Sequence, residues 1–408
     1  MRVAVYTLGC KVNSVESRSI MKKLTERGCE VFDNITFADD YVLNTCSVTA
    51  EADRKCRQTV GKIIKTNPDA KIYVIGCSSQ RNPEAYTKYP NVVHICGNGK
   101  KMSVIDAIMS DITSETVVNV AELPSVYEEF AYPAHTKTRE FIKIQDGCNN
   151  FCSYCIVPHL RGRERSRSIE SIVAEAKAAT SVCGEIVLTG INVSSYGRDI
   201  GVTLCDLFAE LSKIRVRKRL SSLECNIVSY EFLDIMKRGG FCDHFHLSLQ
   251  SGSNGVLKRM NRHYTAEQYF EKAEMIKNVF PNAGITTDII TGFQGETEAE
   301  FEETVLFCRA VGFSDMHIFP YSERAGTKAA GLPQIPMEIR RERAERLISV
   351  KEELKSEFLS KQPGKTLSVY VETDGEGYST NYVKVYTDKE EGCICDVKIN
   401  SLYKKGVK

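Results

Sequence analysis

The fold and the chemistry of this chain are both indicated by one segment, FIKIQDGCNNFCSYCIVPHLRGRERSR, at residues 141–167. Its apolar beginning, 141–147, predicts a β-strand. Three cysteines follow that strand at once, Cys148, Cys152 and Cys155. Three thiolates can bind three irons of a four-iron cluster. We therefore expect an iron–sulfur cluster that keeps one iron open for a small molecule.

Two other interpretations of these cysteines remain open at this point. His159 lies four residues after Cys155 and would complete a Cys3His zinc site. Alternatively, the cysteines are ordinary buried hydrophobic residues. Their position at the head of a series of strands and helices favours a catalytic cluster.

Five further strand candidates follow the cysteine loop, with helical segments between them. They lie at 185–190, 219–224, 245–250, 284–292 and 315–321. Six parallel strands with crossover helices predict a partial (β/α)6 barrel. A charged helix at 337–361 ends this region. The remaining tail alternates β-branched or aromatic residues with polar ones, which predicts a small β-barrel domain.

The N-terminal part predicts a separate α/β domain with a doubly wound parallel sheet, because apolar runs alternate with helical patterns. The runs lie at 3–8, 41–45, 71–76 and 92–96. Three of them end at a cysteine, namely Cys10, Cys46 and Cys77. Ligands in such sheets lie beyond the carboxyl ends of the strands. We therefore expect a second three-cysteine site on one edge of the sheet, rather than three separate buried thiols.

These patterns divide the chain into four parts. We expect an N-terminal α/β domain at 1–112, a linker at 113–136, a barrel with its trailing helix at 137–362 and a β domain at 363–408.

The composition agrees with an intracellular enzyme. The formal net charge of the 408 residues is +1, so any nucleic-acid site must be a local patch. The chain contains 16 cysteines, and in a reducing compartment these indicate metal binding or catalysis. We see neither a signal-peptide layout nor an apolar run near the roughly 18–20 residues that span a bilayer. We expect a cytoplasmic protein without membrane attachment.

The C-x3-C-x2-C loop at the head of a partial barrel resembles the radical S-adenosylmethionine superfamily. That resemblance implies that Tyr154 packs near the adenine and that S-adenosylmethionine chelates the open iron and yields a 5′-deoxyadenosyl radical. The two cysteine triads together resemble the methylthiotransferases, whose C-terminal domain is the TRAM domain. Further segments carry this resemblance, at 185–197, 246–265 and 286–301.

The family resemblance implies two [4Fe-4S] clusters and a reaction that inserts a methylthio group at an unactivated C–H carbon. It also implies tRNA as a partner, a sulfur donor, and an electron donor such as flavodoxin or ferredoxin. Three branches of the family differ in substrate. They modify threonylcarbamoyladenosine next to the tRNA anticodon, isopentenyladenosine in tRNA, or an aspartate of a ribosomal protein.

Three segments resemble the threonylcarbamoyladenosine branch. They are TLGCKVNSVES at 7–17, LRGRERSRS at 160–168 and GYSTNYVKV at 377–385. This branch implies that the methylthio group enters at C2 of the adenine at position 37.

Four arginines beside the cysteine loop form a possible substrate-binding strip for tRNA phosphates or for the threonylcarbamoyl carboxylate. They are Arg161, Arg163, Arg165 and Arg167. The alternative is solvated arginines, or ion pairs with Glu164 and Glu170. For S-adenosylmethionine we expect contacts from residues at strand ends, although each is also a plausible structural polar group. These residues are Thr189, Gly190, Glu224 and Gln250.

Two hypotheses from other classes remain. One is a radical enzyme that forms a different product and in which the N-terminal cluster only transfers electrons. The other is a zinc-stabilised RNA-binding protein without redox chemistry. Iron and sulfide analysis separates the zinc hypothesis from the cluster hypothesis.

Overall fold

The computed structural model describes residues 1–110, 116–120, 122–130, 138–373 and 375–408. The chain divides into two compact units that do not follow the order of the sequence. Unit 1 contains Met1–Ala134, Lys143–Arg167 and Ser322–Thr327. Unit 2 contains His135–Ile142, Ser168–Tyr321 and Lys328–Lys408. The cysteine loop, which we expected inside a barrel domain at 137–362, is thus part of the same compact unit as the N-terminal strands.

Unit 1 is built on a parallel sheet with the strand order β2-β1-β3-β4-β5-β6. Its strands are β1 (Arg2–Thr7), β2 (Glu30–Phe32), β3 (Asp40–Thr45), β4 (Lys71–Gly76), β5 (Val92–Cys96) and β6 (Val117–Asn119). The doubly wound parallel sheet is therefore confirmed. The short strands β2 and β6 were not predicted. β6 lies inside the predicted linker, and part of that linker falls outside the described residues.

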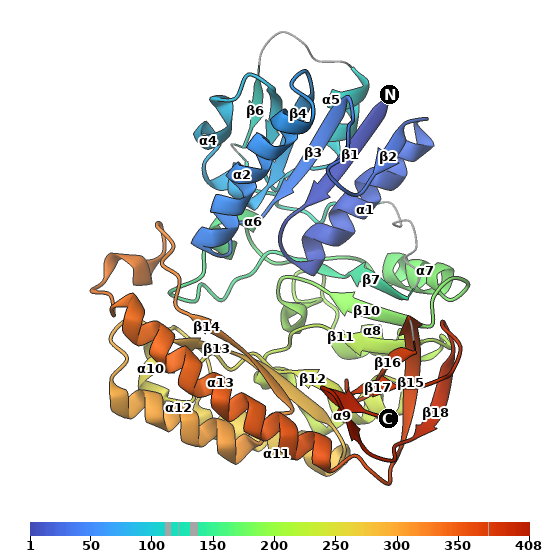
Figure 1. The fold of residues 1–408 in the computed structure, drawn as a ribbon, viewed down its shortest axis with the longest axis vertical. Coiled ribbons are helices and arrows are strands. Elements are labelled where there is room, and N and C mark those ends of the chain that lie inside the picture. The colour runs from blue at the N-terminus through green and yellow to red at the C-terminus, as the bar shows by residue number, and fades with distance from the viewer. Residues whose placement is uncertain (111–115, 121, 131–137, 374) are drawn as a thin grey trace. The chain divides into compact units, whose positions relative to one another are not determined.

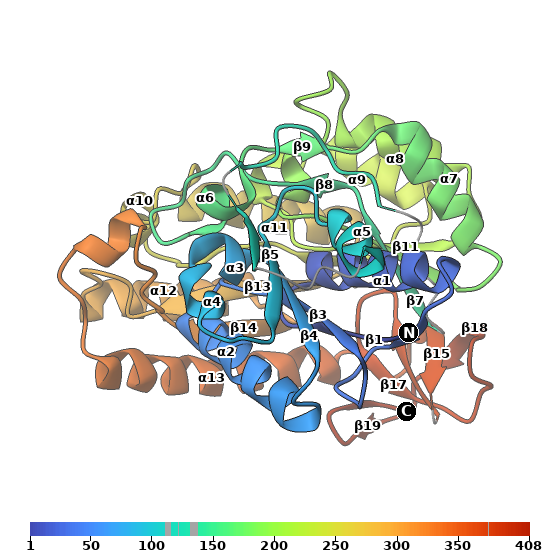
Figure 2. The same ribbon diagram turned by 90° about the horizontal axis from the view of Figure 1, so that it is seen from above.

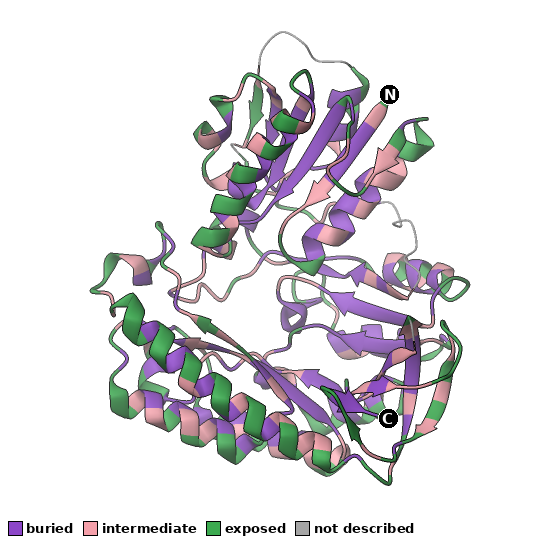
Figure 3. Ribbon diagram, viewed as in Figure 1, coloured by how far each residue is buried: buried purple, intermediate pink, exposed green. Residues whose placement is uncertain are grey.

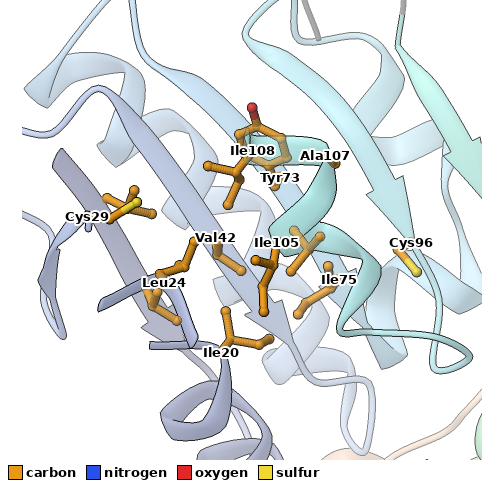
Figure 4. Close-up of a cluster of buried hydrophobic side chains, with 13 residues drawn as sticks. Ile20, Leu24, Cys29, Val42, Tyr73, Ile75, Cys96, Ile105, Ala107 and Ile108 are labelled. Carbon is orange, nitrogen blue, oxygen red and sulfur yellow. The ribbon is translucent and has the colours of Figure 1, made fainter. Parts of the chain in front are cut away.

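Helices cover both faces of this sheet (Figure 2). Helices α1 (Lys11–Glu26) and α5 (Ser103–Met109) pack on one face, and α2 (Ala50–Thr66) packs on the other. Figure 4 shows the first of these two cores, in which aliphatic side chains of α1 and α5 meet those of the central strands. Both faces are buried, so the central strands are mainly apolar, although β3 also buries Asp40, Asn44 and Thr45.

Unit 2 contains two three-stranded sheets, ordered β11-β10-β7 and β12-β13-β14. The pairs β10–β11, β12–β13 and β13–β14 are parallel. Their strands are β7 (Arg139–Lys143), β10 (Glu185–Thr189), β11 (Arg217–Leu220), β12 (His244–His246), β13 (Gly284–Thr291) and β14 (Asp315–Pro320). Parallel bridges between Lys218 and Phe241 and between Leu223 and Leu247 join the two sheets. This arrangement has the six strands that we predicted for a partial barrel.

Three helices of unit 2 begin at a threonine whose side chain caps the helix. Thr203, Thr265 and Thr297 form capping boxes at the start of α8 (Leu204–Ser212), α11 (Ala266–Val279) and α12 (Glu298–Val311). The remaining helices longer than one turn are α7 (Ile169–Ala179), α9 (Tyr230–Arg238), α10 (Asn254–Arg259) and α13 (Met337–Ser360). Figure 1 shows α12 and α13 along one side of β13 and β14, and Figure 3 shows that α13 carries buried and exposed stripes.

The tail forms a separate mixed sheet ordered β18-β15-β16-β17-β20-β19. Its strands are β15 (Thr366–Thr373), β16 (Glu376–Ser379), β17 (Lys384–Tyr386), β18 (Ile394–Lys398), β19 (Leu402–Tyr403) and β20 (Gly406–Val407). The pairs are antiparallel except β17 with β20. Within the described residues, no helix is both long and apolar enough to cross a membrane.

Candidate iron–sulfur centre

The first cysteine triad lies at the carboxyl ends of three neighbouring strands. β1 pairs with β3, and β3 pairs with β4, so these strands end side by side. Cys10 caps α1, Cys46 follows β3, and Cys77 begins α3 (Cys77–Arg81). The strand order reverses between β1 and β3, which is the position where open α/β sheets bind ligands. The prediction that the three cysteines share one sheet edge is confirmed.

Two glycines allow the chain to come close to these thiols. Gly9 has φ +123°, and a Cβ atom there would lie 2.8 Å from the Cβ of Cys46. Gly76 has φ +104°, and its Cβ would lie 2.6 Å from the carbonyl oxygen of Thr45. Burial raises the pKa of the Cys46 thiol to about 11, and the nearby Cys77 and Cys10 thiols add to this rise.

The second cysteine triad lies in a loop closed by a short hairpin. Strands β8 (Gln145–Asp146) and β9 (Arg165–Ser166) pair antiparallel on either side of the loop. The main-chain N–H of Cys148 donates to Gly162 O at 3.2 Å. Gly147 has φ +71°, and a Cβ atom there would lie 1.9 Å from Arg163 O. Only glycine fits at that point of the hairpin.

The two cysteine sites share neighbours inside unit 1. Cys77 packs with Ile156 and Leu160 in one buried cluster. Leu160 lies in α6 (Val157–Arg161), directly after the second cysteine triad. The side-chain amide of Asn98 donates to the Cys77 sulfur at 3.6 Å and to Leu160 O at 2.9 Å. Asn98 follows the end of β5, so the same strand-end reasoning that identified the cysteines applies to it, although we did not predict it.

A buried charge network, formed by Glu16, Lys101, Lys143, Asp146 and Arg161, links α1 to the cysteine loop. Glu16 accepts from Arg161 at 3.0 Å and from Lys143 at 2.9 Å, and it also pairs with Lys101. Asp146 accepts from Lys143 at 2.6 Å and from Arg161 at 3.0 Å. Although burial opposes ionisation, Arg161, Lys101 and Lys143 hold the pKa of Glu16 well below its usual value. The network therefore remains charged at neutral pH.

Arg161 also connects this network to the first cysteine triad. Its Nη2 donates to Asn13 Oδ1 at 2.6 Å, and the Cys10 thiol lies 3.8 Å from the same oxygen. The Asn13 amide donates to Leu8 O at 2.9 Å and to Thr45 O at 3.0 Å. Asn13 and Glu16 lie one turn apart on α1, and sequence reasoning missed both.

Three of the four arginines in the predicted strip are buried, and substrate binding by the strip remains a prediction. Arg161 pairs with Glu16, Arg165 with Asp146 and Arg167 with Glu129. Arg163 alone of the four is exposed, and its guanidinium lies 4.6 Å from the centre of the Phe151 ring.

The chemistry of the donor set fits four-iron clusters better than zinc. Ligands of a tetrahedral zinc ion lie roughly 3.8 Å apart, given Zn–S bonds of ~2.3 Å. Within the described part of the chain, the one His, Cys, Asp and Glu set with all its ligand atoms within 4.8 Å of one another is His246, Asp288 and His317. His159 instead packs edge-on against Phe151. Three thiols at each site match the three irons that a protein binds in a four-iron cluster with one open iron.

The residues predicted to contact S-adenosylmethionine lie at strand ends of unit 2, except for Tyr154, which is half-buried in the cysteine loop. Thr189 ends β10, and Gly190 follows it. Glu224 follows β11 and pairs with Arg262 at 3.3 Å. Gln250 follows β12 with φ +75°. Their contact with S-adenosylmethionine remains a prediction.

Comparison with known proteins agrees with this arrangement. Residues 142–308 match the model of the radical SAM superfamily, and residues 2–97 match that of an uncharacterised protein family, UPF0004. The chain is 39% identical to the threonylcarbamoyladenosine tRNA methylthiotransferase MtaB of Bacillus subtilis, over 97% of this chain and 93% of that protein. It is 36% identical to a tRNA-2-methylthio-N(6)-dimethylallyladenosine synthase of Caldicellulosiruptor saccharolyticus, over 92% of this chain and 82% of that protein.

A solved structure shares the fold at low identity. The radical S-adenosylmethionine methyltransferase TsrM of Kitasatospora setae is 14% identical, with a TM-score of 0.59 over 81% of this chain and 74% of that chain. The similarity to methylthiotransferases spans nearly the whole sequence and includes both cysteine sites. The chain therefore belongs to the family of radical S-adenosylmethionine methylthiotransferases.

Proposed function

We propose that this protein is a tRNA methylthiotransferase that acts on threonylcarbamoyladenosine beside the anticodon. The observation that carries the proposal is the presence of two three-cysteine sites in one compact unit, each one ligand short of saturating a four-iron cluster. The name of the 39% identical relative supports the threonylcarbamoyladenosine substrate.

In this proposal the chain's own residues bind and orient the reacting groups. Cys10, Cys46 and Cys77 hold one cluster, and the second triad, in the hairpin loop, holds the other. When bound, the clusters and S-adenosylmethionine supply the sulfur, the methyl group and the one-electron chemistry that side chains lack. The Arg161 cation lies beside the first triad and favours negative charge there. An external electron donor, such as flavodoxin or ferredoxin, and a sulfur donor complete the cycle.

The test uses full-length protein reconstituted anaerobically and anticodon stem-loop RNAs that carry threonylcarbamoyladenosine or dimethylallyladenosine. Mass spectrometry of the nucleosides should detect a methylthio product from the first RNA. A product from the dimethylallyl RNA alone would assign the substrate of the Caldicellulosiruptor relative instead. No product from either RNA, in protein with full iron content, would contradict tRNA methylthiolation.

Iron analysis tests the two clusters separately from activity. The wild-type chain should bind about eight irons, and Cys46→Ala or Cys152→Ala should each bind about four. Cys308→Ala is the matched control, because Cys308 is a buried cysteine in α12 of unit 2. Stoichiometric zinc without sulfide would contradict the cluster assignment.

A further inference from the structure

Three side chains from neighbouring strands of unit 2 form a group to which we have assigned no role in binding the clusters or S-adenosylmethionine. His246 of β12, Asp288 of β13 and His317 of β14 are called the imidazole–carboxylate group here. His246 Nε2 lies 3.2 Å from Asp288 Oδ2, and His317 Nδ1 lies 3.2 Å from Asp288 Oδ1. Asp288 and His317 are direct partners in the β13–β14 register. The strands thus place one carboxylate between two imidazoles.

The imidazole–carboxylate group lies on one face of the β13–β14 pair, together with Thr286 and Asp315. Side chains alternate across a strand, and Ile285, Thr287 and Ile289 of β13 are buried. Helix α13 packs against β13 and β14 (Figure 1). Asp288 lies between these buried positions and is 27% exposed, and the His317 side chain is 60% exposed. The group is therefore accessible to a ligand.

The group lies beside a predicted cofactor contact. The main-chain N–H of Gln250 donates to Asp288 O at 2.8 Å, and Ile290 N donates to Gln250 O at 2.9 Å. Residues at the carboxyl ends of barrel strands form the active site in barrels of this type. Asp288 and His317 each lie three residues before the last residue of their strand, and the group borders Gln250, the predicted contact to S-adenosylmethionine.

The hydrogen bonds fix the orientation of the rings. His246 Nδ1 and His244 Nε2 both lie 2.9 Å from the hydroxyl of Thr286. Because that hydroxyl has one proton, it donates to one ring at most and accepts from the other. His246 is therefore held from both sides, by Thr286 and by Asp288. His317 uses only Nδ1 in its bond to Asp288, which leaves Nε2 to meet a ligand.

The charges around His317 favour its protonated form. The groups that face it are Asp288, His246, Asp315 of its own strand and Lys351 of α13. The hydrogen bond to Asp288 raises the pKa of His317, burial opposes this, and the charges of Asp288 and Asp315 add to the rise. Burial tends to raise the pKa of Asp288, but both histidines hold it well below its usual value. When His317 is protonated, Asp288 holds the ring through Nδ1, and Nε2–H can donate to a ligand.

We propose that His317, oriented by Asp288 and His246, binds the carboxylate of the threonylcarbamoyl group and thereby selects an anionic N6 substituent on the adenosine. This inference rests on the proposed function. A dimethylallyl group has no anion to pair with His317, and it would desolvate the charged side chains without replacing their hydrogen bonds. The imidazole–carboxylate group therefore favours the threonylcarbamoyl substrate over the dimethylallyl one.

The test compares two stem-loop RNAs on the reconstituted holoenzyme, one with the free threonyl carboxylate and one with its methyl ester. The ester keeps the shape and removes the charge. Wild-type protein should prefer the free acid by about 10- to 100-fold in kcat/KM, the range expected for a charge-assisted hydrogen bond. His317→Gln should lose this preference, with a large loss on the acid and little change on the ester. His263→Gln removes an exposed imidazole elsewhere in unit 2 and should keep the preference.

Three outcomes would overturn the inference. An equal loss on both RNAs by His317→Gln, at full iron content, would show a purely structural role. One equivalent of zinc or manganese in wild-type protein that is lost in Asp288→Asn would show a metal site instead of a carboxylate site. A wild-type enzyme that methylthiolates acid and ester equally would also refute it, while leaving the proposed function intact. Absence of product from both RNAs would refute the proposed function itself.

Discussion

Replacement of Glu16 by glutamine tests the buried charge network of unit 1. Glu16 is 1% exposed and accepts from Lys101, Lys143 and Arg161. Glu16→Gln keeps the size of the side chain but removes the negative charge. Lys143 and Arg161 would then keep Asp146 as a partner, and Lys101 would lose its ion pair with Glu16.

The expected cost follows from the burial of these groups. Removal of one partner from a buried ion pair destabilises a protein by about 3–5 kcal/mol. In a folding unit of this size, 1 kcal/mol corresponds to roughly 2–4 °C in Tm. We therefore expect the midpoint of unit 1 unfolding to fall by about 6–20 °C.

Calorimetry of cluster-free wild-type and variant proteins at neutral pH measures this difference. Glu26→Gln is the matched control, because Glu26 lies on the same helix and pairs with Lys23 at 2.8 Å, but both side chains are more than 40% exposed. The control should not change Tm measurably. A Glu16→Gln midpoint equal to that of the control would refute the energetic role of the network.

The pH dependence provides an independent check. The folded-state pKa of Glu16 lies below its ordinary value of 4.5. The stabilisation is therefore fully present above pH 4.5 and is lost as the pH falls toward the lower folded-state pKa. The Tm difference between wild-type and variant should shrink below about pH 4.5. A difference that grows in acid would contradict the assignment of Glu16 as the charged partner.

Two further predictions concern the cysteine loop. Gly147→Ala places a Cβ atom 1.9 Å from Arg163 O at a residue with φ +71°. The iron content of this variant should therefore fall from about eight to about four per chain. Gly61→Ala is the control and should keep all its iron, because no atom lies within 4 Å of its new Cβ. Retention of full iron by Gly147→Ala would mean that the loop closes differently. Arg163→Ala removes the one exposed arginine of the predicted strip, so the affinity for RNA should fall. If Arg163 contacts one phosphate, the slope of log K against log salt concentration should decrease in magnitude by about 0.7–0.9. An unchanged slope in a binding titration would exclude a phosphate contact by Arg163.

The sequence alone was sufficient for the parts of this protein that depend on local patterns. The strands that precede Cys10, Cys46 and Cys77 are short apolar runs, and parallel strands align their carboxyl ends. These two facts together place the three thiols on one edge. The C-x3-C-x2-C spacing of the second triad is likewise a local feature, so both cysteine triads can be recognised in the sequence.

Only the tertiary structure determined three features: the ion pairs of the arginines, the division of the chain into two compact units, and the imidazole–carboxylate group. Arg161 looks like a surface residue in an arginine-rich run, but its partner Glu16 is 145 residues away, and their pairing inside unit 1 buries both. His246, Asp288 and His317 come from three separate strands and form no sequence motif. Charge pairing and side-chain convergence depend on which distant segments pack together. Hydrophobic periodicity and cysteine spacing depend on the local chain, and for that reason they can be read from the sequence.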